Sequence, residues 1–288
     1  MANSFMTMKL GPLNLDNPVC LGSAPWELVL RPGAARPGAV FTKTVTMEPL
    51  PGDVSDHVIC RVGEQSLLNR LGLRNSGAEW FVETGLPALA ALGLPVLASV
   101  AAPGVPGFRK LARFLAQRAE GRLAGIELSV ATAVPPTAAG LTADFVREAT
   151  AAVRQEVGPQ VAVLVKLPAW PDHVVALGRG AQAGGADALT AVSPLKALHL
   201  AHDDHAAAPV LGGLSGQALR PVALRCVYEL TSDSEISLPV LGAGGIFSAD
   251  HVADYLRVGA RAVQVASGEW LEPGLTARLA AEFAPVAR

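Results

Sequence analysis

The sequence predicts a single (β/α)8 TIM barrel, and three observations support this fold class. Eight short segments rich in β-branched and apolar residues alternate with longer stretches of helical periodicity. The strand segments are apolar on both faces, which is typical of parallel strands covered by helices on both sides. The length of 288 residues exceeds that of an ordinary domain but suits an α/β barrel, which commonly needs about 250 residues. No composition shift indicates a linker, so residues 1–288 are expected to form one domain.

The strands are expected in chain order after a short opening segment. MKLGPLNLDNPV, residues 8–19, could form a small hairpin before the first barrel strand. Eight units of strand and helix favour a closed barrel over an open sheet. The expected strands cover residues 19–22, 39–45, 95–101, 125–131, 161–167, 188–193, 239–245 and 262–267.

Two of the intervening helices carry clear start and stop signals. In TADFVREATAAVRQEV, residues 142–157, Thr142 is a candidate N-cap. In SADHVADYLRVGA, residues 248–260, Ser248 is a candidate N-cap and Gly259 closes the helix. These signals place helices directly after the fourth and seventh strands.

Composition limits the partners of the protein. Half of the residues are hydrophobic and 17% are charged, with a net charge of −2. The isoelectric point is about 6.3. This balance predicts neither a nucleic-acid surface nor a membrane surface. Small polar or anionic molecules are therefore the expected partners.

The N-terminus and the cysteines indicate a reducing compartment. MANSFMTMKL lacks a basic segment followed by an apolar run, so no secretory signal is expected. No apolar stretch approaches the roughly 20 residues that span a bilayer. Cys20, Cys60 and Cys226 lie far apart, which disfavours a disulfide framework and a zinc or iron–sulfur site. We expect a cytoplasmic protein without a bound metal.

Two of the five lysines in the chain fall near the ends of expected strands. Lys43 lies in FTKTVT and Lys166 lies in VLVKLP. In an α/β barrel the C-terminal ends of the strands form the active-site mouth. A charge at this place is costly unless it meets an opposite charge. The two lysines therefore indicate either an anion-binding site at the mouth or structural ion pairs.

Glycine-rich segments follow the last two strands. In GAGGIFSADH, Gly244 and Gly245 stand between a strand and a helix start, and VQVASGEW ends its strand in Ala266-Ser267-Gly268. Backbone N–H groups at such a place can converge on an anion without interference from a Cβ. Loops after strands seven and eight commonly bind phosphate in this fold. A phosphate site is expected here.

These segments carry a resemblance to a known family. NPVCLGSA, FTKTVT, LLNRLGLRN, VLVKLP, GGLSG, LPVLGAGGIFSADH and GARAVQVAS occur in the order and spacing of class 1 dihydroorotate dehydrogenases. The resemblance covers roughly residues 17–268. It implies FMN at the barrel mouth and transfer of a hydride from dihydroorotate to flavin N5. It also implies a homodimer or a complex with an electron-transfer subunit.

The resemblance assigns the cofactor site position by position. Residues against the isoalloxazine would be Gly22, Ser23, Lys43 and Thr44. Lys166 would stand beside the N1–C2 side of the flavin, where a cation stabilises the anionic reduced ring. Residues around the ribityl phosphate would be Gly216, Gly244, Gly245, Ala266 and Ser267.

The substrate side departs from the family pattern. Where the family has Asn-x-Ser-Cys-Pro-Asn with a cysteine base, residues 129–134 read SVATAV, so Thr132 takes the base position. Thr132 could relay a proton with help from a neighbouring acceptor, or it could merely pack or cap. The family also surrounds its pyrimidine with four asparagines. This chain keeps Asn69 but has Ser129, Val134 and Ser193 at the other three places.

Each hydrogen bond lost from a buried polar group costs about 1–3 kcal/mol, so three losses would strongly weaken dihydroorotate binding. We expect the flavin site to be kept and the substrate site to be changed. Lys43 and Asn69 would orient a small anionic or carbonyl-bearing substrate.

Two further features leave alternatives open. HLAHDDH, expected in the loop after the sixth strand, could bind a metal, supply the missing base or form a solvated surface. Its titratable residues are His199, His202, Asp203, Asp204 and His205. Cys60, expected in the loop after the second strand, could reach the pocket or serve only as packing.

Two rival functions also remain at this point. Lys166 could form a Schiff base in a lyase or aldolase-like barrel, with the glycines holding a substrate phosphate. Alternatively, the chain could be a catalytically retired flavin-binding subunit, which the missing base favours.

Overall fold

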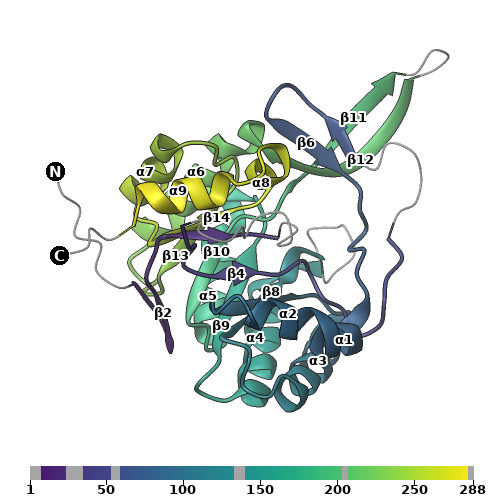
Figure 1. Ribbon diagram of the computed structural model, residues 1–288, viewed down its shortest axis with the longest axis vertical. Helices are drawn as coiled ribbons and strands as arrows, with labels where there is room; N and C mark the ends of the chain where they lie inside the picture. The colour runs from purple at the N-terminus through teal and green to yellow at the C-terminus, as the bar shows by residue number, and fades with distance from the viewer. Residues whose placement is uncertain (1–7, 24–34, 53–58, 133–139, 203–206, 285–288) are drawn as a thin grey trace.

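Eight parallel strands close into a barrel, as the sequence predicted (Figure 1). The computed structural model describes residues 8–23, 35–52, 59–132, 140–202 and 207–284. The strands neighbour one another in the order β10, β13, β14, β3, β4, β7, β8, β9, and β9 pairs with β10 to close the ring. Their bounds are β3 (Val19–Leu21), β4 (Val40–Phe41), β7 (Val96–Val100), β8 (Gly125–Ser129), β9 (Ala162–Leu167), β10 (Ala188–Ala191), β13 (Val240–Ala243) and β14 (Ala262–Val265).

Helices cover the outside of the barrel. The cap predictions are confirmed: the Thr142 side chain accepts a hydrogen bond from the Phe145 N–H, and the Ser248 side chain accepts one from His251 N–H. Gly259 has a φ of +97°, the left-handed conformation that suits glycine after a helix. The helices are α1 (Gly77–Trp80), α2 (Leu86–Ala90), α3 (Gly104–Arg118), α4 (Ala143–Val157), α5 (Pro171–Ala183), α6 (Arg220–Ser232), α7 (Ala249–Arg257), α8 (Ser267–Leu271) and α9 (Leu275–Glu282).

The predicted N-terminal hairpin is also confirmed. It consists of β1 (Met8–Leu10) and β2 (Leu13–Leu15), which pair antiparallel. Its leucines pack with the first interior residues of the barrel, including Cys20, Phe41 and Leu164. Because this group also includes the first residues of β9, β10 and β14, the hairpin closes the N-terminal end of the barrel with apolar side chains.

The second barrel strand is shorter than the predicted 39–45, because an extra residue interrupts its ladder. Phe41 pairs with Leu97, and Val45 forms an isolated bridge with Val100. The stretch from Phe41 to Val45 therefore advances four residues, while the paired stretch from Leu97 to Val100 advances three. This mismatch is the geometry of a β-bulge. Thr42 Oγ1 accepts the Ser99 N–H at 3.1 Å in place of a ladder carbonyl. Lys43 thus lies beyond β4, on the bulge rather than inside a strand.

A second, antiparallel sheet lies beside the barrel and projects from it (Figure 1). Two predictions were wrong here: Cys60 and the histidines His199 and His202 lie on strands instead of loops. Lys196 to Leu200 alternate between more and less exposed side chains, which fits a strand with one face against solvent. Asp203, Asp204 and His205 lie outside the described residues. The strands are β5 (Ile59–Arg61), β6 (Ser66–Asn69), β11 (Leu195–His202) and β12 (Ala207–Gly216).

No helix in the described ranges is both long and apolar enough to cross a lipid bilayer. Cys20 and Cys226 are buried, and neither forms a disulfide.

Candidate active site

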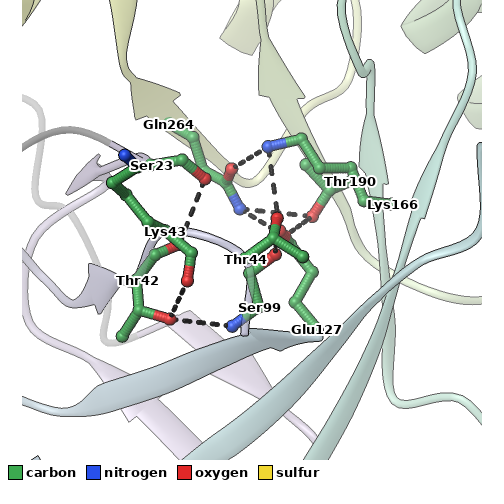
Figure 2. Close-up of polar contacts among 9 residues, drawn as sticks. All are labelled: Ser23, Thr42, Lys43, Thr44, Ser99, Glu127, Lys166, Thr190 and Gln264. Carbon is green, nitrogen blue, oxygen red and sulfur yellow. Dashed lines mark hydrogen bonds and ion pairs between the residues drawn. The ribbon is translucent and has the colours of Figure 1, made fainter. Parts of the chain in front are cut away.

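A cluster of polar side chains lies inside the barrel beneath its C-terminal mouth (Figure 2). Lys166, next to the last residue of β9, has a side chain that is only 12% exposed. Its ammonium donates a hydrogen bond to Gln264 Oε1 at 2.8 Å. An ammonium carries three N–H donors, so Lys166 retains capacity to bind an anion at the mouth while Gln264 holds it.

Glu127 forms the base of this cluster. Its carboxylate is fully buried, and one oxygen accepts hydrogen bonds from Thr190 Oγ1 at 2.8 Å and from Gln264 Nε2 at 2.6 Å. The other oxygen, Oε2, lies 3.7 Å from Lys166 Nζ. A buried carboxylate is tolerated when it is hydrogen-bonded and paired with a cation, and both conditions hold here.

Sequence reasoning missed Glu127, Thr190 and Gln264. A signal for two of them was present, because Glu127 interrupts the apolar strand GIELSVA and Gln264 interrupts AVQVAS. Lys166 was predicted to be either an anion ligand or a structural ion pair. It makes an ion pair with Glu127 and also lies at the mouth, so the two alternatives are compatible.

The bulge after β4 gathers a second group of predicted site residues (Figure 2). Ser23 Oγ donates to the Thr42 carbonyl at 3.1 Å, and Thr42 Oγ1 donates to the Lys43 carbonyl at 2.8 Å. Thr44 Oγ1 and Ser99 Oγ lie 3.1 Å apart and share a hydrogen bond. These contacts fix the backbone around Lys43, whose side chain is exposed. Bulges next to active sites commonly re-aim a side chain in this way.

The predicted phosphate-site glycines come together from two different segments. Gly216 ends β12 with a φ of +88°, and Gly244 and Gly245 follow β13 with φ values of +135° and +66°. A Cβ on Gly245 would lie 2.7 Å from the Gly216 carbonyl oxygen. Glycine is therefore required here by backbone conformation and by contact with neighbouring chain, in addition to any ligand.

The ends of β3 and β14 lie side by side. The Gly22 N–H donates to the Val265 carbonyl at 2.7 Å, and a Cβ on Gly22 would lie 3.0 Å from the Ala266 Cβ. Ser267 is the first residue of α8. Gly22, Ala266 and Ser267, predicted as cofactor residues, are thus brought together at one side of the mouth.

His251 supports the glycine loop from α7. Its Nδ1 accepts the Phe247 N–H at 3.1 Å, which requires that nitrogen to be unprotonated. Burial lowers the pKa of His251, and the nearby Arg220 guanidinium lowers it further. The loop after β13 is therefore held by a neutral imidazole.

The predicted substrate residues are spread over several elements. Asn69 ends β6, and its amide donates to the Gly213 carbonyl at 3.4 Å. Ser129 ends β8 and pairs with Lys166 in the ladder. Thr132 ends the short 3-10 helix Val130–Thr132, and Val134 lies outside the described residues.

Ser193, two residues beyond β10, is 5% exposed. Within the described part of the chain its Oγ is buried without a hydrogen-bond partner. A buried hydroxyl without a partner is unusual in a folded protein and marks a place where a ligand could bind.

The remaining cavity and metal candidates do not add to this site. A hollow of about 500 Å³ is lined by Asp16, Arg36 and Gly38 among others, at the opposite end of the barrel. Across the described ranges, no group of three or more His, Cys, Asp or Glu side chains is arranged to hold a metal ion.

The comparisons with known proteins reported below agree on one family. The sequence model of the family described as "Dihydroorotate dehydrogenase" matches residues 12–284. The chain is 33% identical to the "Dihydroorotate dehydrogenase B (NAD(+)), catalytic subunit" of Maridesulfovibrio salexigens, over 95% of this chain and 90% of that protein. It is 29% identical to the protein of the same description from a Geobacillus species, over 96% and 89% of the two chains. The counterpart from Desulforudis audaxviator is 34% identical, over 85% and 79%.

Proposed function

This chain belongs to the dihydroorotate dehydrogenase family, and we propose that it is an FMN-dependent oxidoreductase with a diverged substrate pocket. The reaction would move a hydride between a CH–CH bond of a small anionic or carbonyl-bearing substrate and the flavin. The position of Lys166 carries the proposal: it is a nearly buried cation at the barrel mouth, held by Gln264 and retaining free donor capacity.

The residues at the mouth fit FMN. Lys166 offers a cation to the ring, and the positive-φ glycines after β12 and β13 present backbone without side chains to a phosphate. When bound, FMN supplies a two-electron acceptor that takes up hydride. The residues that would hold it are Gly22, Ser23, Lys43, Thr44, Lys166, Gly216, Gly244, Gly245, Ala266 and Ser267.

Lys166 and Lys43 would act on different groups, Lys166 on the flavin ring and Lys43 on the substrate. Lys166 favours negative charge where the ring gains electrons, because a fixed cation in a water-poor site stabilises developing charge. Lys43 stands exposed on the bulge after β4, where it can orient an anionic or carbonyl oxygen of the substrate. Asn69 would supply an amide to the same substrate.

The substrate side supports divergence from dihydroorotate, the molecule in the names of the relatives. Ser129, Val134 and Ser193 replace asparagines of the family, and a serine cannot offer the two donors and one acceptor of an asparagine amide. Thr132 stands at the base position without the thiol of the family. We therefore expect a substrate with fewer ring hydrogen bonds than dihydroorotate, or slow turnover of dihydroorotate itself.

The partner and compartment follow from the relatives by analogy. Those relatives are named catalytic subunits, so an electron-transfer subunit is the proposed partner, with a homodimer as the other expectation. A cytoplasmic location is proposed with them.

The experiment that tests this proposal identifies the cofactor bound to the purified protein. The purified protein, reconstituted with FMN if needed, is denatured and the released material is separated by chromatography. One FMN per chain supports the proposal, and no FMN after reconstitution contradicts it. A covalent adduct on Lys166 after borohydride treatment with phosphorylated carbonyl compounds would favour the lyase alternative. Bound FMN that no candidate substrate or quinone can reduce or reoxidise would favour a retired subunit.

A further inference from the structure

Glu127 has no role in the flavin site expected from the family resemblance, yet it is the most deeply placed charge in the site. Its carboxylate is fully buried, whereas Lys166, its ion-pair partner, is 12% exposed. Glu127 therefore cannot contact a ligand at the mouth directly. Any effect on that ligand must pass through Lys166 or Gln264.

Gln264 connects the two charges (Figure 2). Its Nε2 donates to Glu127 Oε1 at 2.6 Å, and its Oε1 accepts from Lys166 Nζ at 2.8 Å. A carboxylate only accepts hydrogen bonds and an ammonium only donates them. The two charges thus fix which end of the Gln264 amide faces which partner, and they fix the direction of Lys166.

The carboxylate also acts on the charge of Lys166. Glu127 Oε2 lies 3.7 Å from Lys166 Nζ and has no hydrogen-bond partner in the described part of the chain. At this distance in a buried site, opposite charges interact strongly. The field that Lys166 presents to a ligand at the mouth is therefore partly cancelled by Glu127.

We propose that Glu127 is a positioning residue that orients Lys166 through Gln264 and lowers the reduction potential of the bound flavin by offsetting the Lys166 charge. This inference rests on the proposed FMN site. Electrons added to the flavin place negative charge near Lys166, so an adjacent carboxylate opposes reduction. Removing the carboxylate charge makes reduction easier.

The test is the midpoint potential of bound FMN in Glu127→Gln. Glutamine keeps the shape and an acceptor for Thr190 and Gln264. We expect the two-electron equilibrium to shift at least tenfold toward reduced flavin, which is about 30 mV upward. The matched control is Thr190→Val, which removes one hydrogen bond to the same carboxylate oxygen and changes no charge. Its potential should stay within a few-fold of the wild-type equilibrium.

The outcomes separate this inference from the proposed function. An unchanged or lower potential in Glu127→Gln, or an equal shift in Thr190→Val, would overturn it. Failure of the wild-type protein to bind FMN would instead contradict the proposed function. If Glu127→Gln does not fold, Glu127→Asp takes its place, because the shorter side chain withdraws the carboxylate from Lys166. A smaller upward shift is then expected, and no shift in folded Glu127→Asp would also overturn the inference.

Discussion

The Gly216 carbonyl oxygen lies 2.7 Å from the point where a Cβ on Gly245 would stand. Residue 245 also has a φ of +66°, a conformation that costs other residues about 1–2 kcal/mol. The two glycines thus join the end of β12 to the loop after β13 with no space for a side chain. This junction is where the phosphate of the cofactor is proposed to bind.

Gly245→Ala is expected to lower FMN occupancy sharply and to destabilise the protein, because the added methyl must displace the Gly216 backbone. Gly121→Ala is the matched control: residue 121 has a φ of +73° but open space around its Cβ position. It should lose about 1–2 kcal/mol of stability and keep its FMN. Flavin absorbance and urea unfolding measure both effects. Equal FMN occupancy in the two variants would show that the phosphate lies elsewhere.

Lys166→Met is expected to reduce the unfolding free energy of the apoprotein by about 3–5 kcal/mol, because it leaves the Glu127 carboxylate buried without a cation. The double variant Lys166→Met with Glu127→Gln should recover most of this loss. Chemical denaturation of the single and double variants gives the coupling. Losses that simply add would mean that the two groups do not interact.

Stability should fall as the pH drops below about 6.5, in part because of His251. Its pKa is lower in the folded protein than in the unfolded chain, so the unfolded chain binds more protons between the two values. The contribution is present above the unfolded pKa and is lost as the pH falls through the folded pKa. In His251→Gln, urea unfolding between about pH 5 and pH 8 should show a weaker pH dependence. An unchanged pH profile would remove His251 from this account.

Dihydroorotate oxidation by the unmodified protein is expected to be slow, and Thr132→Cys should accelerate it. A thiol ionises near pH 8.5, and general-base catalysis contributes about 10²–10⁴-fold. Ser129→Asn and Ser193→Asn belong in the same protein, because weak binding would hide part of the gain. Thr132→Val is the control without a hydroxyl. Anaerobic bleaching of the flavin measures the rate, and rapid turnover by the unmodified protein would contradict a diverged substrate pocket.

Much of the fold could be predicted because its signals are local. Apolar strands, the Thr142 and Ser248 caps and the Gly259 helix end each depend on a few neighbouring residues. The caps, the helix end and the eight strands in their order were confirmed, but the strand predicted at 39–45 ends at Phe41. The antiparallel sheet was missed because its strands carry polar residues such as His199. Residues 196–200 do not alternate between apolar and polar types, since the exposed side chains include Leu198 and Leu200, so β11 gave no period-two signal in the sequence.

The polar cluster could not be predicted in the same way. Glu127, Thr190 and Gln264 come from three strands that meet only when the barrel closes. The bulge at Lys43 likewise depends on pairing with β7, as the Thr42 contact with Ser99 shows. A charged or amide side chain in an apolar strand indicates a polar site inside the barrel. The sequence does not show which other side chains it contacts there.

A crystal structure of the protein reconstituted with FMN would test the central claim most directly. The account predicts the flavin ring beside Lys166 and the phosphate against Gly216, Gly245 and Ser267. FMN bound elsewhere, or an empty barrel mouth at saturating FMN, would contradict it.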